Sequence, residues 1–427
     1  MDHREWLEEI VAAEIVQKRE DGCDPLDLER RFGADKDSMS ERQLEEFWGR
    51  VNSLRPERPN YVEPSTLEAV LNAASLPQDR GPVNVDSLGE RIRGAWTGRC
   101  AGCLLGKPVE GWTKARIERH LRECEAYPLT DYFPACNGDG EDRRYMLEGG
   151  IGGMPRDDDL DYTILGLHMV EEHGLRITSE EIGEEWLDHL PYRSVYTAER
   201  VAYRNLVNMI PIPDTATYLN PYREWIGAQI RADIWGFIHP GRPRMASELA
   251  FRDARVSHVK NGIYGEMMAA AMVSKAFTSG DPLEIVDVGL SAIPAKSRLH
   301  EAVEDVIGWS QDLGSWTECW RLIEDTYGHY SPVHTINNAL NVICALVYGG
   351  GDFGRTIGIA VMCGWDTDCN GATTGSIVGA MVGSGGIPDR WSDPLEDRIE
   401  SHVRGFTRNR ISDLARRTFD LACSTRS

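Results

Sequence analysis

The stretch CGWDTDCNGATTGSIVGAMVG, residues 363–383, determines the fold. It opens with two carboxylates, Asp366 and Asp368, and continues as an apolar run with glycine at every fourth position from Gly371 to Gly383. Residues four apart lie on one face of a helix, and each glycine costs a helix roughly 1 kcal/mol relative to alanine. Such a face predicts close packing against another backbone. The run is far shorter than the roughly 20 apolar residues of a membrane span, so we expect a buried helix with two acids at its N-terminal end.

A second stretch, residues 94–106, repeats this construction with the sequence GAWTGRCAGCLLG. Its glycines also recur at every fourth position, and Glu110 follows shortly after the last of them. We therefore expect a second buried helix that ends beside an acid. Two such helices can cross backbone to backbone and bring their ends into one site. The pattern alone does not decide whether these two faces contact each other.

Composition restricts the class of partner. The chain has 427 residues and a net charge of −22, which argues against nucleic acid or an anionic membrane as a partner. The start of the chain lacks the basic-then-apolar pattern of a secretory signal. The ten cysteines are scattered, without a spacing typical of zinc sites or disulfide frameworks. We therefore expect reduced thiols and a cytoplasmic location.

The periodicity of the sequence is helical almost throughout. Alternation with period two, which is typical of strands, is nearly absent, so we predict an all-α fold. Residues 1–85 are charged and helical in pattern, and we predict that they form an N-terminal helical extension. Residues 86–390 contain both glycine helices and form the predicted main domain, and residues 391–427 form a predicted closing helix.

Acidic residues gather at the start of two predicted helices. Four carboxylates lie within residues 157–161, and Asp366 and Asp368 supply two more. Acids this crowded repel one another unless they are solvated, protonated or neutralised by cations. A solvated surface turn explains a single run of acids, but both of these runs open helices of buried character. Together they predict a metal site with hard oxygen ligands, which suits Mg²⁺ or Mn²⁺.

At these residues the sequence resembles the ADP-ribosylglycohydrolase family. The family's first motif, Gly-Asp-Ala-Leu-Gly-x-Pro-x-Glu, is similar to Gly102–Glu110. Its Thr-Asp-Asp-Thr motif matches the position of Asp157–Leu160, and its Gly-Gly-Asp-Thr-Asp-Thr-Asn motif is similar to Gly364–Asn370. The resemblance covers roughly residues 88–390 with order and spacing kept. The resemblance implies that the predicted main domain, residues 86–390, is a catalytic domain.

The resemblance implies a compact all-α fold, a magnesium site with two ions and a set of functional residues. By position, the metal ligands are Asp157, Asp158, Asp159, Asp366, Asp368 and Cys369. Glu110 corresponds to the family's glutamate beside the metals, and we predict that it is the acid/base, with Asp158 and Asp368 also catalytic. The residues expected to bind substrate are Gly227, Gln229, Arg231, His258 and Trp365.

Several positions depart from the family pattern and indicate a divergent subgroup with its own substrate. Asp157 replaces a threonine and adds a negative charge, Leu160 replaces a threonine hydroxyl, and Cys103 replaces an aspartate. Cys369 offers sulfur where a hard metal prefers oxygen, which favours Mn²⁺ over Mg²⁺ at that ligand. Because Cys369 stands at a helix N-terminus, we expect the pKa of its thiol to be lowered.

The chemistry implied is hydrolysis of an N- or O-ribosyl bond. Cleavage builds positive charge on the ribose, two cations can fix its hydroxyls and activate water, and a carboxylate can assist proton transfer. We expect a small molecule or an ADP-ribosylated substrate, and the added N-terminal extension favours a small molecule. Tyr222, Trp225 and Trp235 are either stacking partners for a base or core residues. The alternative is a non-catalytic descendant that binds a ligand or has a structural role, and the retained Glu110 argues against it.

Overall fold

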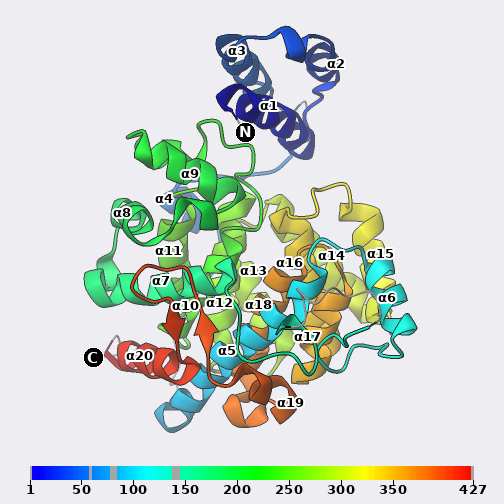
Figure 1. Ribbon diagram of the computed structural model, residues 1–427, viewed down its shortest axis with the longest axis vertical. Coiled ribbons are helices and arrows are strands. Elements are labelled where there is room, and N and C mark those ends of the chain that lie inside the picture. Colours follow the sequence, from blue (N-terminus) through cyan, green and yellow to red (C-terminus); the bar gives the residue numbers. More distant parts are fainter. Residues whose placement is uncertain (1, 57–59, 77–83, 137–144, 425–427) are drawn as a thin grey trace.

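The computed structural model describes residues 2–56, 60–76, 84–136 and 145–424. It confirms the all-α prediction, since helices fill most of the described chain (Figure 1). The named strands are β1 (Ile399–Glu400) and β2 (Arg408–Asn409), which pair antiparallel in a short ribbon. In the part of the chain that the structure describes, none of the helices has the length and apolarity that crossing a bilayer requires.

The two glycine helices, α5 (Val85–Gly106) and α18 (Thr367–Val382), pack against each other in the centre of the molecule. A methyl group added at Gly98 would overlap the carbonyl of Gly375, and one added at Gly102 would overlap the carbonyl of Gly371. The two backbones are therefore in direct contact along the glycine faces. This contact answers the question that the sequence pattern left open.

Other helices surround this pair and complete the apolar core. Those closest to the centre are α7 (Asp158–His173), α10 (Asp233–Phe237), α11 (Pro243–Ala254), α12 (Asn261–Ala276), α16 (Thr335–Gly349) and α17 (Phe353–Met362). The outer helices are α4 (Leu67–Ala73), α6 (Lys114–Glu123), α8 (Ser179–His189), α9 (Thr197–Val207), α13 (Pro282–Ser291), α14 (Arg298–Asp312), α15 (Trp316–Tyr327) and α19 (Asp389–Ser392).

The C-terminal helix, α20 (Ile411–Ser424), packs against α5. The indole N–H of Trp96 on α5 donates a hydrogen bond of 3.0 Å to the hydroxyl of Thr418. Both side chains are fully buried. The end of the described chain is thus part of the same core as the glycine helices, and the domain boundaries at residues 85 and 390 stay a prediction.

Three helices near the N-terminus form a layer at one end of the molecule, next to α9 (Figure 1). They are α1 (His3–Glu20), α2 (Leu26–Asp35) and α3 (Glu41–Asn52). Their apolar side chains, such as Leu7 and Phe47, form a cluster that also includes Val201 of α9. The layer is therefore packed on the main body rather than separate from it.

Buried ion pairs also join this layer to the main body. The guanidinium of Arg223 donates to both carboxylate oxygens of Glu14 on α1, at 2.7 and 2.9 Å. Arg298 at the start of α14 donates to the carbonyl of Glu20 at the end of α1 at 2.9 Å and pairs with the carboxylate of Asp21, the C-cap of α1, at 3.4 Å. Loss of one partner would leave the other charge buried and unpaired, which is strongly destabilising. These pairs therefore fix the position of the layer.

The structure corrects the expectation for the cysteines. Cys124 and Cys136 form a disulfide, and the remaining eight cysteines are free. The expectation of reduced thiols throughout was wrong because a pair twelve residues apart carries no recognisable signature in the sequence. This pair removes the argument from cysteine usage for a cytoplasmic location.

The backbone contact predicts that a single methyl group on the glycine face is destabilising. Gly98→Ala should lower the free energy of unfolding by about 1–3 kcal/mol, because the two helices must separate to admit it. The matched control is Gly308→Ala on α14, where an added methyl meets no atom within 4 Å. The control should raise stability by up to about 1 kcal/mol through helix propensity. Chemical denaturation measures both, and a stable Gly98→Ala variant would contradict the contact.

Candidate active site

The predicted metal ligands, except the buried Asp159, line a cavity of about 310 Å³ between three helix ends. Glu110 follows the short 3-10 helix η2 (Lys107–Val109) that extends α5. Residues 157–159 lie at the start of α7, and Asp366 and Asp368 lie at the start of α18. The hydroxyl of Thr367 donates to the carbonyl of Gly106 at 2.8 Å, so the start of α18 is fixed to the end of α5.

Three of the predicted ligands face a basic side chain. The pairs are Lys107 with Asp157, Arg99 with Asp159 (Nη2–Oδ1 3.3 Å), and Arg156 with Asp158 (Nη1–Oδ1 3.8 Å). Asp157 and Asp159 are buried, whereas the side chain of Asp158 keeps 28% of its surface exposed. The negative charges of Asp157, Asp158 and Asp159 are thus balanced by basic side chains of the protein itself.

The other three carboxylates have no Lys, Arg or His partner among the described residues. Glu110, Asp366 and Asp368 each offer an oxygen within 4.8 Å of the others. Oδ1 of Asp368 is buried and accepts no hydrogen bond. Burial, followed by the charges of Asp366 and Glu110, holds the pKa of Asp368 well above its usual range. Burial and neighbouring carboxylates raise the pKa of Glu110 and of Asp366 as well. This donor set fits a hard divalent cation.

A second donor group lies beside the first. Asp159, Asp368 and Cys369 also present ligand atoms within 4.8 Å of one another. Burial, followed by Asp159, raises the pKa of the Cys369 thiol well above its usual range. The expected lowering by the helix N-terminus is therefore wrong, because burial among carboxylates outweighs the helix dipole. Asp159 is shared between this group and Arg99.

Lys107 is a site residue that the sequence reasoning missed. Its ammonium contacts Oδ2 of Asp157, and Oδ1 of Asp157 accepts the backbone N–H of Asp159 at 3.1 Å. Both oxygens of Asp157 are thus engaged in pairing Lys107 and in capping α7. The signal was present in the sequence, since Lys107 stands inside the first motif and Asp157 is the added acid of the second. Because Asp157 adds a negative charge to an already crowded acidic site, a basic side chain such as Lys107 is expected nearby to balance it.

The glycine loop predicted to bind substrate lines the cavity only in part. Gly227 faces the cavity, and a side chain there would overlap the carboxylate of Glu199. Gln229 and Arg231, in η7 (Gln229–Arg231), are buried behind it. Arg231 pairs with Glu199 and with Asp253, the latter at 3.1 Å. The geometry therefore makes Arg231 a support for the loop rather than a substrate contact.

His258, Trp365 and Trp235 also lie outside the cavity lining. His258 is fully buried, and its Nδ1 lies 2.8 Å from the hydroxyl of Ser257. Trp365 packs near Trp320 with ring centroids 6.1 Å apart, and its backbone N–H donates to the carbonyl of Trp112. Trp235 is a core residue. Substrate contacts predicted at His258 and Trp365 thus have no counterpart in this geometry.

A larger cavity of about 610 Å³ adjoins the inner one. The two share Tyr196, Thr197 and Trp225 in their linings. The N-terminal layer supplies one wall of this outer cavity, and the guanidinium of Arg204 stacks on Trp6 at 3.6 Å from the ring centre. The wall thus combines aromatic and cationic groups.

A sequence profile of ADP-ribosylglycohydrolases matches residues 84–427. The chain belongs to the ADP-ribosylglycohydrolase family. No curated protein is significantly similar to it in sequence. One similar solved structure is described as an ADP-ribosylglycohydrolase-related protein complex. It is 20% identical, covers 79% of this chain and 99% of its own, and superimposes with a TM-score of 0.49.

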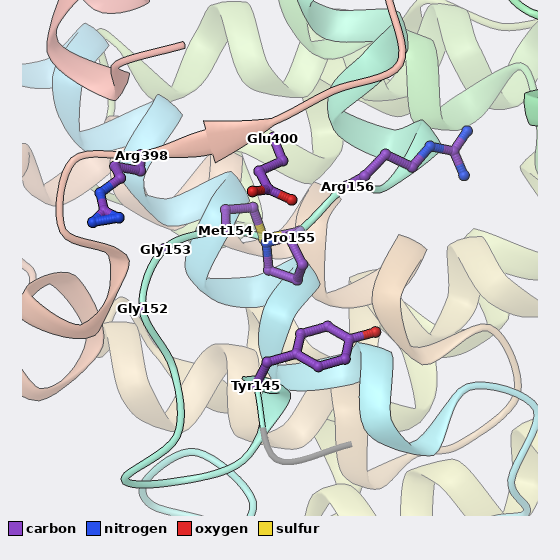
Figure 2. A pocket seen from close by; sticks show the side chains of 8 residues that line it. All are labelled: Tyr145, Gly152, Gly153, Met154, Pro155, Arg156, Arg398 and Glu400. Carbon is purple, nitrogen blue, oxygen red and sulfur yellow. The ribbon is translucent and has the colours of Figure 1, made fainter. Parts of the chain in front are cut away.

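This member of the ADP-ribosylglycohydrolase family has a further cavity of about 460 Å³ on the other side of Arg156 (Figure 2). Figure 2 shows the guanidinium of Arg156 directed away from it, and Arg156 donates to Asp161 at 2.9 Å. Among the described residues, Glu400 is the one carboxylate in its lining. In this part of the chain the cavity therefore lacks the converging acids that mark the inner one.

The unpaired carboxylates predict an unusual dependence of stability on pH. Since the pKa of Asp368 is raised on folding, the folded state holds its proton more tightly, and stability falls as pH rises. In EDTA, Asp368→Asn should therefore be more stable than wild type at pH 8, by roughly 1–3 kcal/mol. The advantage should shrink on acidification. Mg²⁺ or Mn²⁺ should raise the melting temperature of the wild type more than that of the variant.

Asp287→Asn on α13 is the control, since Asp287 is exposed and far from any such cluster in the described chain. It should leave both the pH profile and the response to metal unchanged. Identical melting curves for wild type and Asp368→Asn, with and without metal, would contradict the assignment of a cation site.

Proposed function

We propose that the protein is a metal-dependent hydrolase that cleaves an N- or O-ribosyl bond. The observation that carries this proposal is the group of three converging carboxylates, Glu110, Asp366 and Asp368, which lack any cationic partner among the described residues. A buried carboxylate without a partner is costly. Its presence at a cavity in a protein of this family supports a catalytic function, because a merely structural role would favour neutral side chains there.

Asp366 and Asp368 are the residues that would hold a Mg²⁺ or Mn²⁺ ion, with Glu110 beside them. A second ion would rest on Asp159, Asp368 and Cys369, and the sulfur of Cys369 favours Mn²⁺ over Mg²⁺ there. Bound divalent cations supply Lewis acidity, which lowers the pKa of water and positions sugar hydroxyls. Asp157 contributes indirectly, since it positions Lys107 and the start of α7.

Glu110 is the residue that we assign to proton transfer. It is the most exposed of the three acids, and it faces the cavity from a different element than the two aspartates. Burial, followed by the charge of Asp366, raises the pKa of Glu110 when no cation is bound, and a carboxyl group at this position can give or take a proton. Asp158 also lines the cavity with an exposed carboxyl, where it can accept a hydrogen bond from a ribose hydroxyl.

The two adjoining cavities support a substrate in two parts. The inner cavity would hold the ribose, and the outer cavity would hold an aromatic group and an anionic linker. Trp6 and Trp225 offer aromatic faces, while Arg200 and Arg204 offer positive charge in the same lining. An ADP-ribosyl group has this chemistry. Because α1 closes one side of the outer cavity, a free small molecule fits the entrance better than a folded ADP-ribosylated protein.

The proposed role of Glu110 predicts a large loss of turnover on a conservative change. Glu110→Gln, assayed at saturating Mn²⁺, should lower kcat by about 10²–10⁴-fold, the usual contribution of a general acid. Its far-UV spectrum and melting temperature should stay close to wild type. Release of ADP-ribose or ribose from N-linked and O-linked substrates, both free and peptide-bound, measures the effect.

The matched control is Glu123→Gln at the exposed end of α6, which should leave kcat unchanged. Wild-type turnover that survives Glu110→Gln would contradict the assignment. If the wild type binds ADP-ribose but hydrolyses none of the substrates, the non-catalytic alternative is supported instead.

The outer cavity predicts a binding defect without a chemical one. Trp6→Ala should raise KM by roughly 5- to 100-fold, from about 1–3 kcal/mol of lost stacking, with kcat nearly unchanged. Trp48→Ala is the control, since Trp48 packs in the same layer but does not line the cavity. Steady-state kinetics measures KM and kcat separately for both variants. Equal effects of Trp6→Ala and Trp48→Ala would mean that the N-terminal layer acts on stability alone.

A further inference from the structure

The far end of α7 and the end of α8 carry a group of metal-ligating side chains outside the acidic site. His168, Glu185 and His189 each offer one ligand atom that lies within 4.8 Å of the other two. We propose that these three side chains form a binding site for Zn²⁺ or a chemically similar late first-row cation. Imidazole and carboxylate ligands suit such ions, whereas Mg²⁺ prefers oxygen alone.

The spacing of the ligand atoms fits tetrahedral coordination. Oε2 of Glu185 lies 2.9 Å from Nδ1 of His189 and 3.6 Å from Nε2 of His168. With zinc–ligand bonds of about 2.0–2.1 Å, tetrahedral ligand atoms lie roughly 3.3 Å apart. The two observed distances fall on either side of this value. Small side-chain rotations therefore suffice to close the site around an ion.

Two of these atoms lack a hydrogen bond. Oε2 of Glu185 and Nδ1 of His189 are buried and make no hydrogen bond, although they lie 2.9 Å apart and would form an ion pair if the imidazole were protonated. Buried polar atoms in native structures nearly always have a partner. A cation between them would satisfy both atoms at once.

The carboxylate of Glu185 is already oriented for this role. Nε2 of His173 lies 2.7 Å from the other oxygen, Oε1, and so turns Oε2 toward His168 and His189. Metal ligands are commonly held by such outer hydrogen bonds, and loss of one typically weakens metal binding by about 10–100-fold. His173 is thus a positioning residue for the proposed site.

The proposed site joins three segments of the fold. Glu185 and His189 lie one turn apart on α8 and face His168 on α7. The loop between β1 and β2 lies beside α7 in Figure 1, and the ring centroid of Phe406 in this loop lies 5.0 Å from that of His168. His168 follows Asp158 by ten residues, which places it about 15 Å along the helix from the acidic site. A bound ion here would therefore be separate from the acidic site.

Zinc binding by the full-length protein tests the proposal independently of any hydrolase activity. Metal-free protein is titrated with Zn²⁺ against a chromophoric indicator in saturating Mg²⁺. The titration should reveal a tight site that is also present in Asp368→Asn, a variant that weakens any Zn²⁺ binding at the acidic site. Zn²⁺ should also raise the melting temperature, as any ligand specific for the folded state does. His189→Ala should abolish tight binding. His173→Ala should weaken Zn²⁺ binding by about 10–100-fold, because His173 only orients the ligand Glu185.

Two further variants complete the design. Glu185→Gln keeps size and polarity while removing the charge, so it should abolish tight binding even if His189→Ala fails to fold. His300→Ala on α14 is the matched control, since His300 faces a single carboxylate, Glu304, at 3.4 Å and has no second histidine beside it in the described chain. Its zinc affinity should equal that of the wild type. Unchanged affinity in Glu185→Gln, or absence of a tight site in wild type, would overturn the proposal.

Discussion

Direct contact between the backbones of α5 and α18 is the constraint on which the rest of the structure depends. Along the glycine faces, the nearest neighbours of each helix are backbone atoms of the other, so backbone contact sets their separation. The hydrogen bond from Thr367 to the carbonyl of Gly106 fixes their ends in register. Glu110 and Asp366 therefore reach the cavity at positions that repacking of side chains elsewhere cannot alter. We therefore expect sequence changes in this family member at residues around the cavity rather than at the glycines between α5 and α18.

The acidic site divides into a paired half and an unpaired half. Lys107, Arg99 and Arg156 neutralise the aspartates that open α7, and these pairs hold the helix start in place. The carboxylates at the ends of α5 and α18 have no such partner in the described chain. Carboxylates at the start of α7 thus support the structure through ion pairs, whereas those at the ends of α5 and α18 have no basic partner in the described chain and could bind a ligand.

Much of this architecture could be predicted from the sequence. The four-residue glycine spacing indicated two buried helices, and the acids at their ends indicated one site, because both signals are local. The roles of Arg231 and His258 could not be read in this way. Whether a residue lines a cavity or supports its wall depends on the three-dimensional packing, and both residues proved to be buried and outside the cavity lining. The outer cavity was equally hidden, since it joins residues near the N-terminus to residues beyond position 190.

The pairing of Asp157 with Lys107 has a consequence for how the cavity attracts its ligand. Six carboxylates and the three basic groups that face them leave a formal charge of −3 when all are ionised. One divalent ion reduces this to −1, and a second reverses it to +1. If all these groups were ionised, the metal-free cavity would repel an anionic substrate and only two bound ions would attract it. The raised pKa values of Asp368, Glu110 and Asp366 reduce this repulsion, because protons on these carboxyls lower the negative charge when no cation is bound. The number of bound metal ions would then control the binding of an anionic substrate as well as its hydrolysis.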